Sequence, residues 1–461
     1  MIDSLKPYPQ YRDSDLPWLE KFPAHWELIP NRALMFERRK VVGKNAADYT
    51  LLSLTLGGII PRDMEKPKGK FPAQFNTYKV VKGDDLVFCL FDIDETPRGV
   101  GHSQLNGMIT GAYDVFSPRP RVNPRYLFLY YLFIDEGKRL RPLYKGLRKT
   151  IQRGTFASLK TPCPPRDEQD AIVRFLDYAT GRIERAIRAK KKLIALLNEQ
   201  KRVIIHRAVS RGLSLDVPLK PSGIPWLGDI PQHWEVRRLK SVGKTNIGLT
   251  YSPSELIEAG GVLVLRACNI KNGEIVSSDD VFVKKAIPEA LLTKREDILI
   301  CARSGSRSLV GKSALIPPAF ENVTFGAFMT IFRSSINDFV FWVLNSNLFN
   351  YVMAQFETST INQLTQRDLN TISIPIPPRK EQREIVRYIE ERIVQSNTAV
   401  ARAEREIALL QEYRTRLTAD IVTGKADVRE VVRHLPAEYI EAADDAEIEE
   451  TPEPELEPAE A

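Results

Sequence analysis

Residues 164–176 read PPRDEQDAIVRFL, and residues 377–389 read PPRKEQREIVRYI, so one stretch occurs twice at an offset of 213. The likeness continues through LLNEQKR (196–202) and LLQEYRT (409–415), and it ends at AVSRG (208–212) and IVTGK (421–425). A proline pair followed by acids and then by apolar residues is typical of a helix start. The repetition indicates a chain built from two tandem halves.

A second repeated segment lies ahead of each helix at an offset of 208. Residues 16–27 read LPWLEKFPAHWE, and residues 224–235 read IPWLGDIPQHWE. Four of the five tryptophans of the chain fall into matched pairs in these segments. We interpret the repeated His-Trp pairs, His25-Trp26 and His233-Trp234, as packing and hydrogen-bonding residues, not as catalysts.

The two helices carry a heptad pattern. Between Ile389 and Ile421, apolar or small residues recur in alternating steps of four and three, with Arg414 as an interruption. The same register runs from Leu176 to Ala208, where Lys190 and Lys201 interrupt it. A helix of ~44 residues is ~65 Å long. Antiparallel pairing as a coiled coil is therefore predicted, and the alternative is that each amphipathic helix lies on its own domain.

Between the repeated segments lie two variable blocks, which are rich in predicted strands and broken by Gly and Pro. DLVFCLF (85–91) and DILICAR (297–303) are examples, and KGDDLVF (82–88) is similar to KREDILI (294–300). The predicted fold class is α+β: two tandem-related α/β domains, separated by two long antiparallel helices, with pseudo-twofold internal symmetry. The expected segments are 1–27, the first block 28–161, the central helix 162–212, the repeated segment 213–235, the second block 236–374, the C-terminal helix 375–430 and an acidic, disordered tail 431–461.

The net charge of +7 is unevenly distributed along the chain. Residues 436–461 hold eleven acids and no Lys or Arg, so residues 1–435 carry +18. Such a positive charge on residues 1–435 favours binding of a polyanion such as nucleic acid, although a surplus of Lys and Arg also keeps a protein soluble. No stretch is long and apolar enough for a membrane span, no secretory signal precedes Gln10, and the four scattered cysteines form no CxxC pair. We therefore expect a cytoplasmic protein with no membrane attachment, no metal and no cofactor.

The sequence lacks the common catalytic motifs. The run Gly305–Ser313 resembles a phosphate-binding loop, but it has five residues between its glycines where that motif needs four. A glycine-rich turn between strands at 298–303 and 313–316 is the preferred interpretation. None of the three Pro-Pro pairs, at 164–165, 317–318 and 377–378, belongs to the Asn/Asp-Pro-Pro-aromatic tetrapeptide of a DNA amino-methyltransferase. We expect no catalytic residues in this chain.

Taken together, these features resemble the specificity subunit of a type I restriction–modification system. The resemblance rests on the PWLG-x-IP-x-HWE segment (clearest at 225–235), the repeated PPxxEQ helix start and the IVTGK ending. Glu20 departs from the pattern, since the second copy has Gly228. The resemblance implies two target recognition domains that each read half of a bipartite site in double-stranded DNA. It also implies a helical spacer on which two modification (methyltransferase) subunits dock, joined by restriction subunits.

Loops of the two blocks supply the candidate DNA-binding residues, for which ordinary solvated turns are the alternative. The candidates are Arg98, His102, Arg148, Lys149 and Arg153 in the first block, and Arg303, Arg307, Lys312, Thr360, Asn362 and Gln363 in the second. Two other functions stay open at this point: the recognition module of a single-chain restriction enzyme, and a coiled-coil scaffold whose blocks bind proteins.

Overall fold

The computed structural model describes residues 5–62, 75–146, 148–214, 216–306, 309–348, 351 and 363–436. The chain forms two compact units. Unit 1 comprises residues 1–189 and 406–461, and unit 2 comprises residues 190–405. Both long helices, α4 (Arg166–Arg211) and α9 (Arg379–Val422), contribute a part to each unit.

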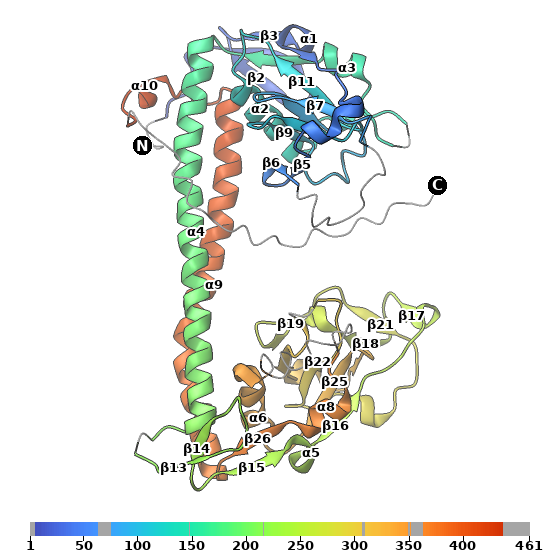
Figure 1. Ribbon diagram of the computed structural model, residues 1–461, viewed down its shortest axis with the longest axis vertical. Helices are drawn as coiled ribbons and strands as arrows, with labels where there is room; N and C mark the ends of the chain where they lie inside the picture. Colours follow the sequence, from blue (N-terminus) through green and yellow to red (C-terminus); the bar gives the residue numbers. More distant parts are fainter. Residues whose placement is uncertain are drawn as a thin grey trace. The chain divides into compact units, whose positions relative to one another are not determined.

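Unit 1 places its short strands and helices between the N-terminus and α4, apart from one short helix that follows α9 (Figure 1). Its strands are β1 (Tyr11–Leu16), β2 (Leu19–Pro23), β3 (Glu27–Pro30), β4 (Met35–Glu37), β5 (Leu52–Thr55), β6 (Gly58–Pro61), β7 (Lys79–Val81), β8 (Leu86–Phe88), β9 (Val100–His102), β10 (Gly107–Ile109), β11 (Asp114–Pro118) and β12 (Lys160–Cys163). Its shorter helices are α1 (Asn31–Leu34), α2 (Pro124–Glu136), α3 (Arg153–Ser158) and α10 (Arg429–Val432).

Unit 2 places its strands and shorter helices between α4 and α9. Its strands are β13 (Leu219–Pro221), β14 (Asp229–Pro231), β15 (Glu235–Arg238), β16 (Lys244–Ile247), β17 (Leu256–Ile257), β18 (Val262–Leu265), β19 (Ile270–Lys271), β20 (Glu274–Ile275), β21 (Val281–Val283), β22 (Ile298–Cys301), β23 (Ser313–Leu315), β24 (Thr324–Phe325), β25 (Met329–Arg333) and β26 (Ser373–Ile376). Its shorter helices are α5 (Leu239–Val242), α6 (Asn337–Val343) and α8 (Gln366–Thr371).

The central sheets of the two units have one topology. Four antiparallel strands follow the order β4-β11-β8-β9 in unit 1 and β16-β25-β22-β23 in unit 2. The flanking pairs also correspond, because β3 pairs with β12 as β15 pairs with β26. The prediction that the variable blocks share a fold is confirmed. They differ in their additions: hairpin β5-β6 and pair β7-β10 in unit 1, and the sheet β17-β21-β18-β24 in unit 2.

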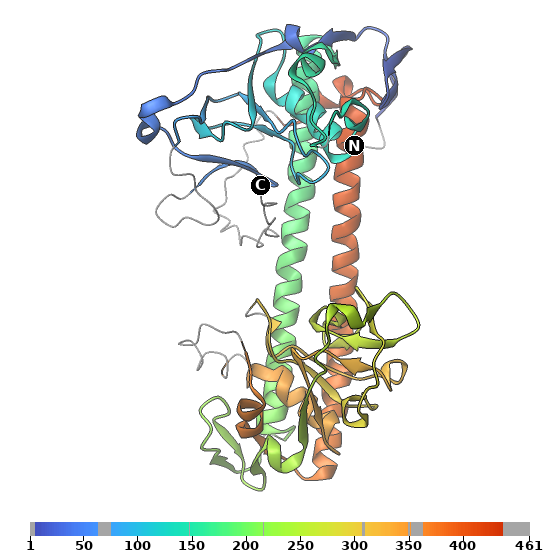
Figure 2. The ribbon, with the colours of Figure 1, turned by 90° about the vertical axis from the view of Figure 1, so that its right-hand side faces the viewer.

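Within each unit, one part of α4 lies beside one part of α9 (Figure 1 and Figure 2). In unit 1, Ile183 and Ile187 share a buried cluster with Leu417 and Ile421. In unit 2, Ile205, Ala208 and Val209 share one with Ile385 and Ile389. The first part of α4 thus packs with the last part of α9 in unit 1, and the last part of α4 packs with the first part of α9 in unit 2, so the predicted antiparallel pairing is confirmed.

Polar residues interrupt this seam at equivalent places in the two units. Arg414 Nη1 lies 3.0 Å from Glu184 Oε1 in unit 1, and Lys201 Nζ donates to Asn397 Oδ1 at 2.9 Å in unit 2. The offset of 213 relates Lys201 to Arg414 and Glu184 to Asn397. Lys201 and Arg414, two of the three cations that interrupt the heptad pattern, are therefore pseudo-symmetry mates, and each finds an acceptor on the opposite helix.

The two repeated motifs meet at the start of each helix. In unit 1, Glu168 of the PPxxEQ motif accepts hydrogen bonds from Trp26 Nε1 at 2.9 Å and contacts His25 Nε2 at 2.8 Å. In unit 2, Glu381 contacts Trp234 Nε1 at 3.0 Å and His233 Nε2 at 2.8 Å. The prediction that the His-Trp pairs pack and form hydrogen bonds is confirmed.

The end of each helix packs on the tryptophan at the start of the other helix. Gly212 after α4 and Gly424 after α9 have φ of 71° and 74°, the left-handed conformation common after a helix C-terminus. A Cβ at residue 212 would lie 3.2 Å from the Trp234 ring, and one at residue 424 would lie 3.0 Å from the Trp26 ring. Each junction thus joins one helix start, one helix end and one tryptophan.

Candidate nucleic-acid interface

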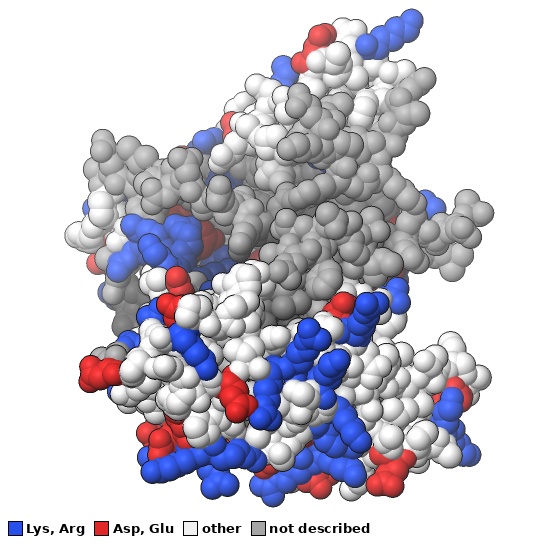
Figure 3. All heavy atoms as spheres, turned by 60° about the horizontal axis from the view of Figure 1, so that its bottom comes forward, with Lys and Arg blue, Asp and Glu red and all other residues white. Residues whose placement is uncertain are grey.

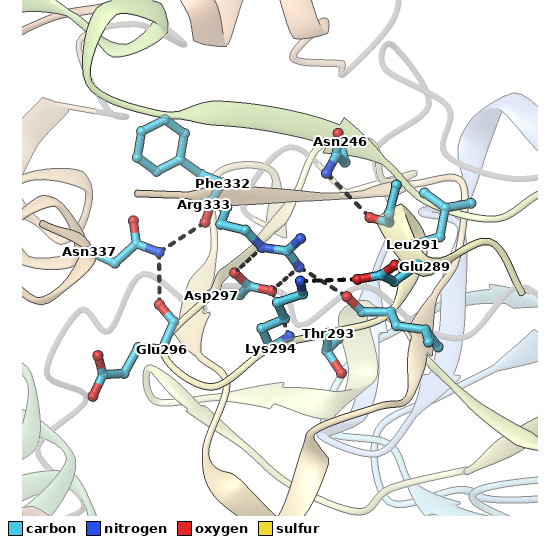
Figure 4. Close-up of polar contacts among 12 residues, drawn as sticks. Asn246, Glu289, Leu291, Thr293, Lys294, Glu296, Asp297, Phe332, Arg333 and Asn337 are labelled. Atoms are coloured by element: carbon cyan, nitrogen blue, oxygen red, sulfur yellow. Dashed lines mark hydrogen bonds and ion pairs between the residues drawn. The ribbon is translucent and has the colours of Figure 1, made fainter. Parts of the chain in front are cut away.

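A buried ion pair fixes the central sheet of unit 2 (Figure 4). Asp297, just before β22, accepts hydrogen bonds from Arg333 Nε at 2.7 Å and from Arg333 Nη2 at 2.6 Å. The hydrogen bond to Asp297 raises the pKa of the Arg333 guanidinium. Asn337, at the start of α6, donates to the carbonyl oxygens of Glu296 and Phe332 at 2.8 Å and 3.1 Å. These contacts hold β22, β25 and α6 as one frame, from which the loops project.

Unit 1 makes the same ion pair with an arginine from another strand. Asp85, just before β8, binds Arg38 Nε at 2.7 Å and Ser117 Oγ at 2.5 Å. The strand registers place Ser117 where unit 2 has Arg333, and Arg38 where unit 2 has Asn246. Both units therefore have the buried carboxylate. Its arginine comes from β25 in unit 2, whereas in unit 1 it comes from the end of β4.

In each unit, the two candidate loops lie together at one end of this sheet. The β8-β9 connection meets the segment before α3, where Ile151 N donates to Leu90 O at 2.8 Å. The β22-β23 connection meets the segment before α8, where Leu364 N donates to Ala302 O at 2.7 Å. Loops about 60 residues apart in sequence therefore form one surface, which the sequence did not predict.

The unit 2 surface combines cations with an exposed ring. The Arg303 guanidinium lies 5.1 Å from the centre of the Phe328 ring, and Phe328 is 57% exposed. The Arg303 backbone forms a bridge with Gln363, and the side chains of Arg303, Lys312 and Gln363 are all exposed. An arginine stacked on an open aromatic face is suited to contacts with bases and phosphates. The strands β22 (298–301) and β23 (313–315) confirm the predicted turn between them.

The corresponding unit 1 surface is more nearly neutral. Asp94 Oδ1 accepts from Arg141 Nε at 2.8 Å, and its other oxygen lies 3.3 Å from Lys149 Nζ. The hydrogen bond from Arg141, supported by Lys149, lowers the pKa of the Asp94 carboxyl. Lys149 also lies 3.6 Å from Glu95. The charge of Lys149 is therefore offset locally, whereas Arg148 beside it is exposed.

The remaining unit 1 candidates have different surroundings. His102 is 8% exposed at its side chain, its Nε2 lies 3.2 Å from Asp84, and burial lowers its pKa. The strand registers give it the place that Leu315 holds in unit 2. Arg153 Nη2 donates to Asp114 at 2.9 Å, and Arg98 Nη2 donates to Leu56 O at 3.2 Å. His102 thus packs as an inner residue of the sheet.

Three candidates lie outside the described residues, and their positions are not described: Arg307, Thr360 and Asn362.

Sequence reasoning missed a surface pocket of about 340 Å³ on unit 1, beside α1 and β4. Its lining includes Arg32, Phe36, Arg39 and Arg153. Phe36 is 47% exposed, and the Arg119 guanidinium lies 5.7 Å from its ring centre. The run NRALMFERR (31–39) could have indicated this surface, because it places an aromatic residue among three arginines.

The equivalent face of unit 2 is a strip of exposed basic residues on β15, α5 and β16. Figure 3 shows Lys and Arg gathered over the end of unit 2 where β15 and α5 lie. The strip consists of Arg237, Arg238, Lys240 and Lys244. At the offset of 208, Lys240 and Lys244 correspond to Arg32 and Phe36 of the unit 1 pocket. The basic run RRLK (237–240) was visible in the sequence but was not singled out.

Among the described residues, no group of three or more His, Cys, Asp or Glu side chains could hold a metal ion. Within the same ranges, no helix is long and apolar enough to cross a membrane.

Residues 231–401 match the family model described as "Type I restriction modification DNA specificity domain". The chain is 31% identical over 206 residues to the type I restriction enzyme EcoKI specificity subunit of Escherichia coli (strain K12), which covers 43% of this chain and 44% of that protein. It is 30% identical over 205 residues to the StySPI specificity subunit of Salmonella potsdam, with the same shares. The chain therefore matches less than half the length of these two relatives.

More distant relatives match a larger part of the chain. The MjaVIII specificity subunit of Methanocaldococcus jannaschii is 26% identical over 320 residues, 66% of this chain and 71% of that protein. A solved structure, reported under a title on complex assembly and conformational transition of the type I R-M system, has a TM-score of 0.58 at 16% identity. It covers 88% of this chain and 99% of that one, a likeness in fold. The duplicated frame, the matched domain and these relatives agree: residues 231–401 are similar to a type I restriction modification DNA specificity domain, and the chain is similar in sequence to type I restriction enzyme specificity subunits.

Proposed function

We propose that this chain is the DNA-binding subunit of a type I restriction–modification complex, and that each unit reads one half of a bipartite, asymmetric site in double-stranded DNA. One observation carries the proposal. Two units with a single sheet topology present the same pair of loops, yet the side chains on those loops differ. Two domains with the same sheet topology but different side chains on their loops suit a DNA site whose two halves differ in sequence.

In unit 2, the reading surface is built on Arg303, Lys312 and Gln363, with Phe328 beneath Arg303. The net charge of +18 over residues 1–435 supplies the attraction to phosphates that DNA binding requires. In unit 1, Arg148 and the pocket beside Phe36 and Arg39 provide the exposed cations and an aromatic face. Arg307, Thr360 and Asn362 remain candidates for the second half-site.

The helices are proposed to dock two modification (methyltransferase) subunits, with restriction subunits joining the complex. Apolar side chains stay exposed on both helices: Leu193, Leu196 and Val203 on α4, and Val394, Leu409 and Tyr413 on α9. Exposed apolar residues along a helix favour contact with a partner. Methyl transfer to a flipped base would take place in the modification subunit, so this chain needs no catalytic residue of its own. Such a complex works in the cytoplasm.

The test is to sequence the methylome of a host that carries this subunit with its cognate modification subunit. Exchanging residues 28–161 for the block of a relative is expected to change one half-site and leave the other. Arg303→Ala with Lys312→Ala is expected to reduce methylation at sites defined by the second half. The matched control is Arg295→Ala, since Arg295 is exposed at the opposite end of β22 and pairs with Glu296 at 3.7 Å. A change in both half-sites after the block exchange would contradict independent reading.

We further propose that the helix pair sets the gap between the half-sites. Inserting seven residues within 183–204 keeps the heptad phase and lengthens the helix by about 10 Å, or about three base pairs of duplex. The half-sites should persist in the methylome while their spacing moves. An active variant with the original gap would show that the helices do not determine the spacing.

A further inference from the structure

One side of α4 in unit 1 carries a row of arginines. Arg174, Arg185 and Arg188 are separated by eleven and three residues, spacings that return to about the same side of an α-helix. Arg182 lies next to this row and stacks on Tyr178, with its guanidinium 5.7 Å from the ring centre. All four arginines are exposed. We call them the α4 arginine row.

The row is not part of the repeated frame. At the offset of 213, Arg182, Arg185 and Arg188 correspond to Gln395, Thr398 and Ala401 of α9. Only Arg174 has a basic counterpart, Arg387. A feature that both halves of the duplicated frame need would occur in both α4 and α9. The row therefore belongs with a part of the chain that is not duplicated.

The end of the described chain is attached to this row. Arg174 Nη2 donates to Leu435 O at 3.1 Å and to Pro436 O at 2.9 Å. Val431, Val432 and Leu435 are buried in the unit 1 core, which fixes this point of departure. The next 25 residues, 437–461, contain all eleven acids of the tail and no Lys or Arg.

We propose that residues 437–461 dock along the α4 arginine row of the same chain. From Arg174 to Arg188 the helix rises about 21 Å, while the segment from 437 to 445, which already holds four acids, extends up to about 30 Å. A single exposed ion pair contributes little, but tethering at Arg174 gives the tail an effective concentration of about millimolar. The contact covers the row against other polyanions, and it weakens as salt rises.

Zero-length carbodiimide coupling tests this contact on the full-length chain. Arginine does not react, so Arg182→Lys and Arg188→Lys keep the charge and introduce an amine that couples only to a carboxylate in contact with it. The matched controls are Arg392→Lys and Arg416→Lys on α9. Arg392 stacks on Tyr388 at 5.4 Å as Arg182 does on Tyr178, and Arg416 is exposed in unit 1.

By mass spectrometry, we expect tail carboxylates to couple to Lys at 182 and 188 at least about fivefold more than to Lys at the control positions. This coupling should disappear in 1 M salt, where the Debye length is only about 3 Å. A mixture of isotope-labelled and unlabelled chain distinguishes coupling within a chain from coupling between chains. Equal yields at 182, 188, 392 and 416, absence of coupling at 182 and 188, or coupling only between chains would each overturn the proposal.

Discussion

Replacing Glu168 by alanine should destabilise unit 1 far more than the equivalent change, Glu381→Ala, destabilises unit 2. Glu168 is 2% exposed at its side chain, and it accepts hydrogen bonds from Tyr8 Oη at 2.5 Å and from Trp26 Nε1 at 2.9 Å. His25 Nε2 lies 2.8 Å from its second oxygen. Burial and the contact with this carboxylate raise the pKa of the Tyr8 hydroxyl, so Tyr8 remains a donor.

Glu381 provides the internal control because the same motif is more open in unit 2. Its side chain is 24% exposed, and it has two partners, His233 and Trp234. His233 is itself exposed, so water can replace its lost contact. Only the buried Trp234 indole would be left without an acceptor.

The expected magnitudes follow from counting buried donors that lose their acceptor, each of which costs about 1–3 kcal/mol. Glu168→Ala leaves the buried Tyr8 hydroxyl and the Trp26 indole unpaired, and it removes the charge 3.9 Å from Arg429. We expect a loss of about 3–5 kcal/mol for Glu168→Ala and about 1–2 kcal/mol for Glu381→Ala. Glu168→Gln keeps an acceptor oxygen and should recover part of the loss.

Hydrogen exchange followed by mass spectrometry is the appropriate assay, since a chain of two units need not unfold in one step. Peptides from β2-β3 and from the start of α4 report on unit 1, and peptides from β14-β15 report on unit 2. Protection in unit 1 should fall by about two to three and a half orders of magnitude, at 1.4 kcal/mol for each tenfold change. The reasoning is refuted if Glu381→Ala lowers protection in unit 2 as much as Glu168→Ala does in unit 1.

Three further outcomes are expected. Burial lowers the pKa of His102, so its contribution to stability is present above about pH 6.5 and is lost as pH falls through the lowered value. The unfolding midpoint of unit 1 should therefore fall less between pH 7 and pH 5 in His102→Leu than in the unchanged chain. Asp297→Ala removes the carboxylate that pairs with Arg333, whose side chain is 28% exposed, and should cost about 1.5–3 kcal/mol in urea unfolding of unit 2, whereas Arg295→Ala should change little. Gly424→Ala should lower the unfolding temperature more than Gly212→Ala, since the added Cβ would lie 2.3 Å from Pro23 in the first case and 2.9 Å from Glu381 in the second.

Much of the frame could be predicted from the sequence, because its signals are local. The proline pair, the acids and the heptad steps that define α4 and α9 lie within a few turns of one helix. The offsets of 208 and 213 then relate one half of the chain to the other without any knowledge of contacts. The shared fold of the blocks followed from the likeness of KGDDLVF (82–88) to KREDILI (294–300), where each strand carries its buried residues and its preceding Asp together.

The candidate nucleic-acid interface was harder to predict, because it depends on residues distant in sequence. The chemistry of His102 and its place near a loop favour a role in DNA binding, yet strand pairing with Leu86 places it on the inner side of the sheet. The aromatic partner of Arg303, Phe328, lies 25 residues along the chain, on the turn before β25. The loop side chains have no fixed spacing that marks them as neighbours.

By itself, the sequence determined the duplication, the two long helices and the basic body, since each is a property of residues close together or of a simple repeat. Tertiary structure alone decided which arginine pairs with which buried aspartate, Arg38 with Asp85 or Arg333 with Asp297. It also decided that the end of each helix packs on the tryptophan at the start of the other helix. The physical reason is that a buried charge or ring must find its partner in three dimensions, and several positions in the sequence can supply that partner equally well.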